Sequence, residues 1–243
     1  RQMKLLVSVT SLKEARNAAA GGANIVDVKN PSEGALGAST PNLLSKIRDA
    51  LRDVELSATL GDLPNLPGTA SFAAFGAAVA GADYVKVGLL GSKALNDAIR
   101  LSRKVVKACR GTGCKVVLAA YADYKRFRGL NPLLLPKVAS ASDADGVLVD
   151  VQRKDSGCVF DYLTEDELVK LSAEANELGL ISALAGGLKA ADVGYVQRLG
   201  FQIFGVRRAA CRVMPNGSRL LDRSLVANLH RLIEDVKKTN TLT

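Results

Sequence analysis

Short apolar runs recur along the whole chain, and between them lie longer stretches with helical patterning. Within the runs, apolar and polar residues do not clearly alternate. Such runs predict strands that are buried on both faces, as in a parallel sheet. We expect eight strands, at Met3–Val9, Asn24–Lys29, Glu55–Leu60, Asp83–Val87, Lys115–Tyr121, Gly146–Val151, Leu180–Ala185 and Gln202–Val206.

The stretches between the runs carry signals of helix starts and stops. Ser11 and Thr40 stand where an N-cap is expected, and Pro41 follows at the first helical position. Thr164 and Glu167 have the spacing of a capping box. We expect helices at Ser11–Ala20, Pro41–Asp53, Thr69–Gly81, Ser92–Arg110, Leu133–Ser142, Thr164–Leu178, Ala191–Leu199 and Asp222–Lys237.

Eight strand–helix units in 243 residues predict a closed (β/α)8 barrel, the TIM-barrel fold. No linker or change of composition divides the chain, so residues 1–243 are expected to form a single domain. A doubly wound open sheet is the alternative, and it would carry a glycine-rich turn directly after the first strand. The turn here is Thr10-Ser-Leu-Lys13, which favours the barrel.

Composition and charge narrow the class of ligand. Hydrophobic residues make up 48% of the chain and aromatic residues only 5%, without any Trp, so the core must be aliphatic. The net charge of +9 suits either nucleic acid or an anionic metabolite. Because the Lys and Arg residues are scattered and form no known nucleic-acid-binding motif, we expect a small anionic metabolite and no nucleic acid.

The spacing of the cysteines indicates whether the protein binds a metal, and the lack of long apolar runs indicates where it is located. Cys109, Cys114, Cys158 and Cys211 form no C-x-x-C pair, and the chain has one His, so no metal site is expected. No signal peptide or membrane-spanning run appears. We therefore expect a cytoplasmic enzyme with reduced thiols and no membrane partner. The small-residue helix at Thr69–Gly81 suggests subunit contacts and hence a homo-oligomer.

Charged side chains gather at the predicted carboxyl ends of the strands, where barrel enzymes build their active sites. A single lysine there can be an ordinary surface residue, or it can form an ion pair at the rim. Several lysines at the same end of the barrel favour a catalytic role, because a neighbouring positive charge lowers the pKa of an ammonium group. A neutral amine can form a Schiff base, and nearby carboxylates can move protons. The residues concerned are Asp27, Lys29, Asp62, Lys86, Asp123, Asp150 and Lys154.

Glycines follow the last two predicted strands, where barrels commonly bind phosphate. Gly186 and Gly187 follow the seventh strand, and Gly205 precedes Arg207 at the end of the eighth. Glycine allows the backbone N–H groups to approach an anion closely. A second possible cradle, Gly88–Lys93, contains Ser92, which could instead be only a helix cap. If both cradles are real, the site binds two phosphates.

Seven motifs together resemble the (5-formylfuran-3-yl)methyl phosphate synthase family, nearly end to end and in the same order. This resemblance implies a (β/α)8 barrel that condenses two molecules of glyceraldehyde 3-phosphate into a phosphorylated furan aldehyde, losing phosphate and water. The product serves the biosynthesis of methanofuran-type C1 carriers, and no cofactor or metal is required. The motifs are Asp27–Pro31, Glu33–Ala38, Ser57–Asp62, Gly81–Gly88, Tyr121–Asp123, Ala183–Gly186 and Gly205–Cys211.

The resemblance also implies roles for single residues. Lys29 would be the Schiff-base lysine, with acid or base roles for Lys86, Lys154, Asp27 and Asp150. The family often has Thr directly after the strand-six aspartate, whereas this chain reads Asp-Val-Gln-Arg-Lys.

The end of the eighth strand is a second departure from the family. Arg208 replaces the usual Gly after Gly205-Val-Arg207. Its charge could strengthen phosphate binding, or its side chain could point outward.

Two other functions fit parts of the pattern. The same lysines could serve a class I aldolase or an enzyme similar to triose-phosphate isomerase. The net charge alone would also suit a non-enzymatic binder of anions or RNA. Formation of a conjugated furan aldehyde would distinguish the synthase from an aldolase or isomerase. A salt-dependent affinity for RNA would indicate the non-enzymatic binder.

Overall fold

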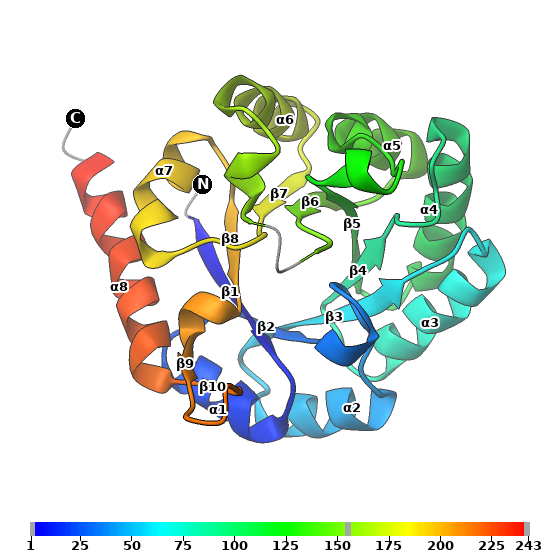
Figure 1. The fold of residues 1–243 in the computed structure, drawn as a ribbon. Helices are drawn as coiled ribbons and strands as arrows, with labels where there is room; N and C mark the ends of the chain where they lie inside the picture. Colours follow the sequence, from blue (N-terminus) through cyan, green and yellow to red (C-terminus); the bar gives the residue numbers. More distant parts are fainter. Residues whose placement is uncertain (1–2, 154–156, 241–243) are drawn as a thin grey trace.

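Eight parallel strands close into a barrel, as predicted (Figure 1). The computed structural model describes residues 3–153 and 157–240. Each strand pairs with its neighbours in the sequence, and β8 pairs back to β1. The strands are β1 (Lys4–Val9), β2 (Ile25–Val28), β3 (Glu55–Asp62), β4 (Tyr84–Gly88), β5 (Lys115–Tyr121), β6 (Gly146–Asp150), β7 (Ile181–Leu184) and β8 (Ile203–Val206).

A ring of helices surrounds the barrel, with α8 between α7 and α1 (Figure 1). Three predicted caps are confirmed. The Ser11 and Thr40 hydroxyls accept backbone N–H groups, and Thr164 forms its capping box with Glu167. The helices are α1 (Leu12–Ala20), α2 (Pro41–Ala50), α3 (Pro67–Val79), α4 (Leu95–Cys109), α5 (Leu135–Ser142), α6 (Glu165–Glu177), α7 (Val193–Arg198) and α8 (Arg223–Asn240).

The barrel strands bury both of their faces, which explains why their sequences do not alternate. In β1, Leu5 and Val7 belong to the large core between barrel and helices, whereas Leu6 belongs to a smaller core inside the barrel. Ile25 of β2 and Leu148 of β6 also lie in the inner core. Because side chains alternate along a strand, Ser8, Asp27 and Asp150 continue the inner series toward the carboxyl end.

The structure differs from the sequence prediction between β8 and α8. A short antiparallel hairpin, β9 (Cys211–Val213) and β10 (Arg219–Leu221), lies there. Its signal in the sequence was the turn dipeptide Asn216-Gly217, with Gly217 at φ +78°. Several loops also contain single 3₁₀ turns: η1 (Pro31–Glu33), η2 (Tyr124–Arg126), η3 (Pro132–Leu134), η4 (Val159–Asp161), η5 (Ala190–Asp192) and η6 (Arg208–Ala210).

None of the helices in the described part of the chain combines the length and apolar character needed to cross a bilayer.

Candidate active site

Lys29 begins a closed loop at the carboxyl end of β2. Pro31 ends the strand and starts η1, because its nitrogen cannot donate to the sheet. The Asn30 N–H donates to the Gly37 carbonyl at 2.8 Å, and the Asn30 side chain accepts from the Ser32 N–H at 3.2 Å. The chain therefore leaves and re-enters the barrel rim at one point, with Lys29 at the base of the loop.

Strand β3 holds this loop against the barrel. The Thr59 hydroxyl donates to the Gly37 carbonyl at 2.6 Å, and Asp62 Oδ2 accepts the Ala35 N–H at 3.0 Å. The other Asp62 oxygen accepts the Tyr121 hydroxyl. Burial, then the Asp62 charge and this hydrogen bond, raise the pKa of Tyr121 well above its usual value, so Tyr121 stays a hydrogen-bond donor.

A buried ion pair lies inside the barrel beneath the loop. Lys86 Nζ on β4 lies 2.7 Å from Asp27 Oδ2 on β2. The same oxygen accepts the Ser8 hydroxyl of β1 at 2.8 Å. All three residues are buried. The contact spans the interior from β2 to β4, which requires that both side chains point inward.

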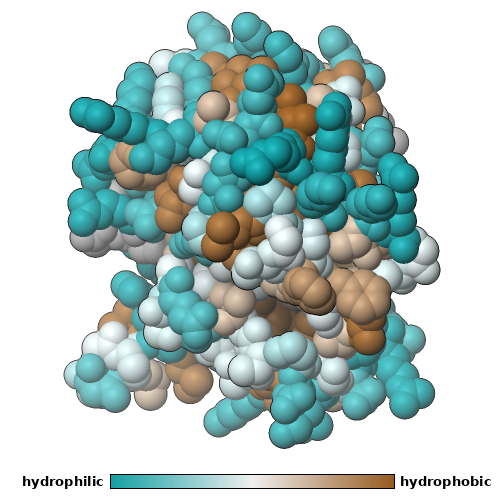
Figure 2. All heavy atoms as spheres, turned by 90° about the vertical axis from the view of Figure 1, so that its right-hand side faces the viewer, coloured by the Kyte–Doolittle hydropathy of each residue, from teal (hydrophilic) through white to brown (hydrophobic). Residues whose placement is uncertain are grey.

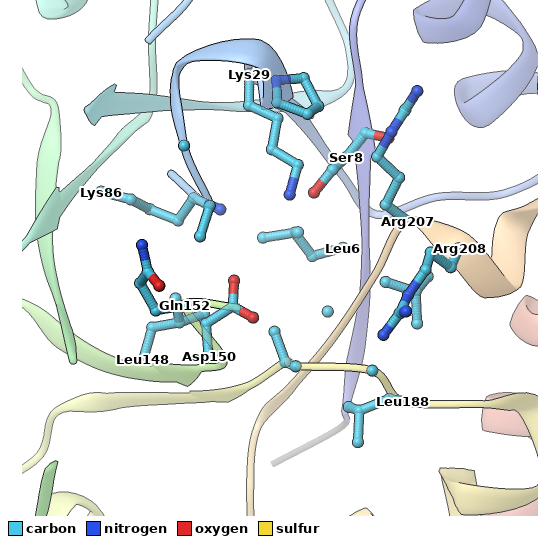
Figure 3. A pocket seen from close by; sticks show the side chains of 18 of the residues that line it. Leu6, Ser8, Lys29, Lys86, Leu148, Asp150, Gln152, Leu188, Arg207 and Arg208 are labelled. Carbon is cyan, nitrogen blue, oxygen red and sulfur yellow. The ribbon is translucent and has the colours of Figure 1, made fainter. Parts of the chain in front are cut away.

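A cavity of about 360 Å³ opens above this pair, at the carboxyl end of the barrel. Lys29, Lys86 and Asp150 enter it from different sides (Figure 3). Asp150 Oδ1 accepts the Val151 N–H at 2.7 Å, which orients the carboxylate. Lysines and a carboxylate that are remote in sequence thus share one partly enclosed space.

The predicted phosphate cradle forms one side of the same cavity. Gly186, Gly187, Gly205 and Arg208 line it. Gly186 and Gly187 have φ values of +96° and +82°, which favour glycine. A Cβ at Gly187 would come within 3.1 Å of Arg208 Nη2. The Arg208 guanidinium therefore lies against the glycine backbone and faces the cavity rim (Figure 3).

Arg207 also lines the cavity, but its guanidinium is bonded to the first strand and helix. It donates to Glu14 Oε2 at 2.9 Å and Oε1 at 3.3 Å, and to the Ser8 carbonyl at 3.0 Å. Burial acts to raise the pKa of Glu14, but Arg207 and the Thr10 N–H and hydroxyl outweigh it, so the pKa lies below its usual value. This cluster joins the end of β8 to the start of α1.

The predicted residue Ser92 lies apart from this arrangement. Ser92 is fully buried, does not line the cavity, and its hydroxyl has no hydrogen-bond partner among the described residues. The alternative that Ser92 caps a helix is wrong, because α4 begins at Leu95 with Ala94 before it. The predicted acid/base residue Lys154 lies outside the described residues.

Sequence reasoning did not assign roles to Glu14, Gln152 and Arg219. Gln152 and Arg219 line the cavity. Arg219 comes from the hairpin that the strand prediction missed. Glu14 lies inside an ordinary helical pattern, and only the structure shows that its carboxylate holds the guanidinium of Arg207.

Cys211 is buried as expected, and burial raises the pKa of its thiol. Within residues 3–153 and 157–240, no three His, Cys, Asp or Glu side chains are grouped so that they could hold a metal ion.

The fold and the cavity define a (β/α)8-barrel enzyme with a lysine- and carboxylate-lined site at the carboxyl ends of its strands. Solved structures agree on the fold. A 3-hexulose-6-phosphate synthase superimposes with a TM-score of 0.61 over 95% of this chain and 99% of its own, at 22% identity. A phosphoribosyl anthranilate isomerase from Thermus thermophilus superimposes with a TM-score of 0.61 over 96% of this chain and 100% of its own, at 16% identity.

The chain belongs to the 4-HFC-P synthase family, whose model matches residues 5–230. Three relatives carry the name (5-formylfuran-3-yl)methyl phosphate synthase. The Methanococcus aeolicus protein is 42% identical over 96% of this chain and 100% of its own. The Methanocaldococcus jannaschii protein is 43% identical over 95% and 99%. The Methanosarcina barkeri protein is 46% identical over 86% and 91%. The predicted family is confirmed.

Proposed function

We propose that this protein is a (5-formylfuran-3-yl)methyl phosphate synthase, a lyase that condenses two molecules of glyceraldehyde 3-phosphate through a Schiff base on Lys29. The product would supply methanofuran-type C1 carriers. The observation that carries the proposal is the meeting of Lys29, Lys86 and Asp150 in one cavity beside Gly187 and Arg208, in a chain of this family.

The proposed chemistry needs an amine and groups that move protons. The Lys29 amine adds to a substrate carbonyl and loses water to give an imine. Loss of a proton from the adjacent carbon gives an enamine, which forms a carbon–carbon bond with the second aldehyde. Ring closure and elimination give the furan, and hydrolysis of the imine frees Lys29. Two substrate molecules yield the product, one phosphate and two waters, with no oxidant, reductant, metal or cofactor.

The neighbours of Lys29 divide into two proton-moving groups in this proposal. Lys86 and Asp27 form one group, because their ion pair and the Ser8 hydroxyl place a donor and an acceptor at the floor of the cavity. Asp150 forms the second group, with its carboxylate oriented by the Val151 N–H. Lys154, four residues after Asp150, remains the predicted partner of this second group.

Phosphate binding is assigned to the glycine cradle and the arginines around it. Gly186, Gly187 and Gly205 let the backbone approach an anion, and Arg208 supplies the charge beside Gly187. Arg207 supports the cradle from below, because Glu14 and Ser8 hold its guanidinium. Two substrate phosphates must be accommodated, and Arg219 gives the cavity a further guanidinium.

Borohydride trapping with glyceraldehyde 3-phosphate tests the assignment of Lys29. Peptide mass spectrometry is expected to find the reduced adduct on Lys29, and Lys29→Ala should abolish both adduct and activity. Lys104→Ala is the matched control, because Lys104 is an exposed lysine on the outer helix α4 and does not line the cavity. An unlabelled Lys29 together with full activity of Lys29→Ala would refute the assignment.

The reaction itself is tested by ultraviolet absorbance of the conjugated furan aldehyde. The synthase produces this absorbance and releases phosphate from glyceraldehyde 3-phosphate alone. A class I aldolase would give the Lys29 adduct without either product. The cytoplasmic location and the homo-oligomer stay predictions that belong to the same proposal.

A further inference from the structure

Gln152 directs an uncharged polar side chain into the cavity. Polar side chains of a protein mostly face solvent, and Figure 2 shows one face of this molecule on which hydrophilic residues cover much of the surface. Gln152 is half-buried instead and lines the cavity. In Figure 3 its carboxamide lies on the side of Lys86 and Asp150, with Arg208 on the other side. A neutral donor and acceptor therefore stands beside the charged groups of the site.

The alternation of side chains along β6 explains why Gln152 points inward. Asp150 at the end of the strand enters the cavity, and Val151 belongs to the core between barrel and helices. Because successive side chains of an extended chain point to opposite sides, Gln152 returns to the inner side. The alternation thus continues for two residues beyond the strand.

A buried carboxylate holds the backbone of Gln152 in this position. Asp123, just after β5, accepts the Gln152 N–H at Oδ1 (2.9 Å) and the Arg153 N–H at Oδ2 (3.1 Å). The Ala122 N–H donates to the Asp150 carbonyl at 2.8 Å. Asp123 is only 1% exposed, and both of its oxygens pair N–H groups that lie beyond the sheet ladder. The chain after β6 is therefore held to the end of β5, and Gln152 enters the cavity from a fixed point.

The carboxamide of Gln152 makes no hydrogen bond to any residue that the structure describes. The hydrogen bond of this residue is made by its backbone N–H. Ordering a long side chain costs rotamer freedom, and a polar group that is withdrawn from water needs a partner. An oxygen atom of a ligand in the cavity would supply that partner.

We propose that Gln152 binds the hydroxyl group of a triose phosphate in the cavity, with Asp123 as its positioning residue. This inference rests on the proposed function. Glyceraldehyde 3-phosphate has a carbonyl, a phosphate and one hydroxyl, which stands on the carbon between the other two groups. Lys29 takes the carbonyl and the glycine cradle takes the phosphate, so the hydroxyl is left for another group in the cavity.

A carboxamide suits this hydroxyl better than the charged side chains around it. Its N–H groups donate and its oxygen accepts, which matches a hydroxyl that does both. The amide is also neutral. Gln152 therefore orients the substrate without entering the proton transfers assigned to Lys86 and Asp150.

Three fixed contacts make the site sensitive to the handedness of its substrate. The carbon that carries the hydroxyl is the chiral centre of glyceraldehyde 3-phosphate. When Lys29 and the cradle hold the groups on both sides of that carbon, only one enantiomer directs its hydroxyl toward Gln152. The other enantiomer leaves the carboxamide unpaired, and the loss of one such hydrogen bond changes an affinity by roughly 2- to 10-fold.

The preference between D- and L-glyceraldehyde 3-phosphate tests this inference. It is measured as the ratio of the initial rates of furan formation, with each enantiomer supplied alone at subsaturating concentration. Gln152→Met keeps the length of the side chain but removes the carboxamide, and it should lower the ratio by roughly 2- to 10-fold. Gln197→Met on α7 is the matched control, because the Gln197 carboxamide oxygen is also unpaired among the described residues and the residue does not line the cavity. It should keep the wild-type ratio.

Asp123→Asn tests the positioning role. The Asn side chain has a single oxygen and cannot accept both N–H groups as the carboxylate does, so the backbone of Gln152 should shift and the ratio should fall. Added to Gln152→Met, the same change should not lower the ratio further, because its effect passes through Gln152. A mere loss of stability slows both enantiomers equally, so an unchanged ratio in Asp123→Asn would refute this role.

The outcomes separate this inference from the proposed function. A wild-type protein that forms neither the furan nor the Lys29 adduct refutes both. A wild-type protein that forms the furan but converts both enantiomers equally, or keeps its ratio in Gln152→Met, refutes only the role of Gln152. So does a control Gln197→Met that lowers the ratio as much. Gln152→Met breaks no side-chain hydrogen bond between described residues, so it should keep the wild-type melting temperature and remain measurable.

Discussion

The buried pair of Lys86 and Asp27 makes a quantitative prediction about stability. Asp27→Asn keeps the shape of the side chain but leaves the Lys86 ammonium inside the barrel without a counter-charge. Both partners are buried and 2.7 Å apart. Removing one member of such a pair costs about 3–5 kcal/mol, because the remaining charge stays desolvated.

That loss is large for a protein of this size. Domains unfold with about 5–15 kcal/mol, so Asp27→Asn should remove about a fifth or more of the stability. For 150–250 residues each kcal/mol corresponds to roughly 2–4 °C, and the melting temperature should fall by about 6–20 °C. Combining Asp27→Asn with Lys86→Met removes both charges and should restore at least about 2 kcal/mol of the loss, because no unpaired buried charge remains.

Urea unfolding followed by circular dichroism measures these free energies for the wild type, both single variants and the double variant. The double variant should be stable but inactive, which separates the contribution of the pair to folding from its proposed contribution to proton transfer. The reasoning about a desolvated pair is refuted if Asp27→Asn costs less than about 1 kcal/mol, or if the double variant loses the sum of the two single losses.

Two further predictions concern the cluster under the cradle and the cradle itself. Because the folded-state pKa of Glu14 lies below its usual 4.5, its carboxylate stabilises the protein above that pH and ceases to do so as the pH falls through the folded-state pKa. Glu14→Gln should therefore cost about 2–4 kcal/mol at pH 7, and urea titrations at successively lower pH should show the difference from wild type shrinking as the pH falls below 4.5; a difference that stays constant throughout contradicts this. Gly187→Ala places a Cβ 2.9 Å from the Cβ of Cys158, whereas Gly179→Ala, also at positive φ, meets nothing. Gly187→Ala should thus raise the KM for glyceraldehyde 3-phosphate and Gly179→Ala should not, and equal kinetics in the two variants would contradict the phosphate assignment.

The barrel could be predicted from the sequence because its signals are local and repeated. Each strand is an apolar run bounded by turn residues, and caps such as Thr164 fix helix starts within a few residues. The lysines and carboxylates could be placed in one mouth because parallel strands of a closed barrel end on the same side. The order of the elements alone predicts that Lys29, Lys86 and Asp150 lie together, and all three line one cavity in the structure.

The details of the phosphate side could not be predicted, because they depend on contacts between remote residues. Arg207 and Arg208 are adjacent, and the 3₁₀ turn after β8 removes the strand alternation that would have told them apart. The partner of Arg207 is Glu14, 193 residues earlier in the chain. No local pattern shows that this pair forms, so the sequence alone left open which arginine faces the cavity.

Asp62 shows how motifs that are separate in the sequence form one packed unit. Its carboxylate accepts the Tyr121 hydroxyl and the N–H group that follows Gly34. A Cβ at Gly34 would lie 2.3 Å from one Asp62 oxygen, and a Cβ at Gly88 would lie 3.3 Å from the other. Gly34 and Gly88 therefore leave room for the Asp62 carboxylate, and the Tyr121 hydroxyl holds that carboxylate in place. Each of these four residues belongs to a different sequence motif. Because this unit fixes the loop that begins at Lys29, the proposed Schiff-base lysine owes its position to strands β3, β4 and β5 as much as to its own.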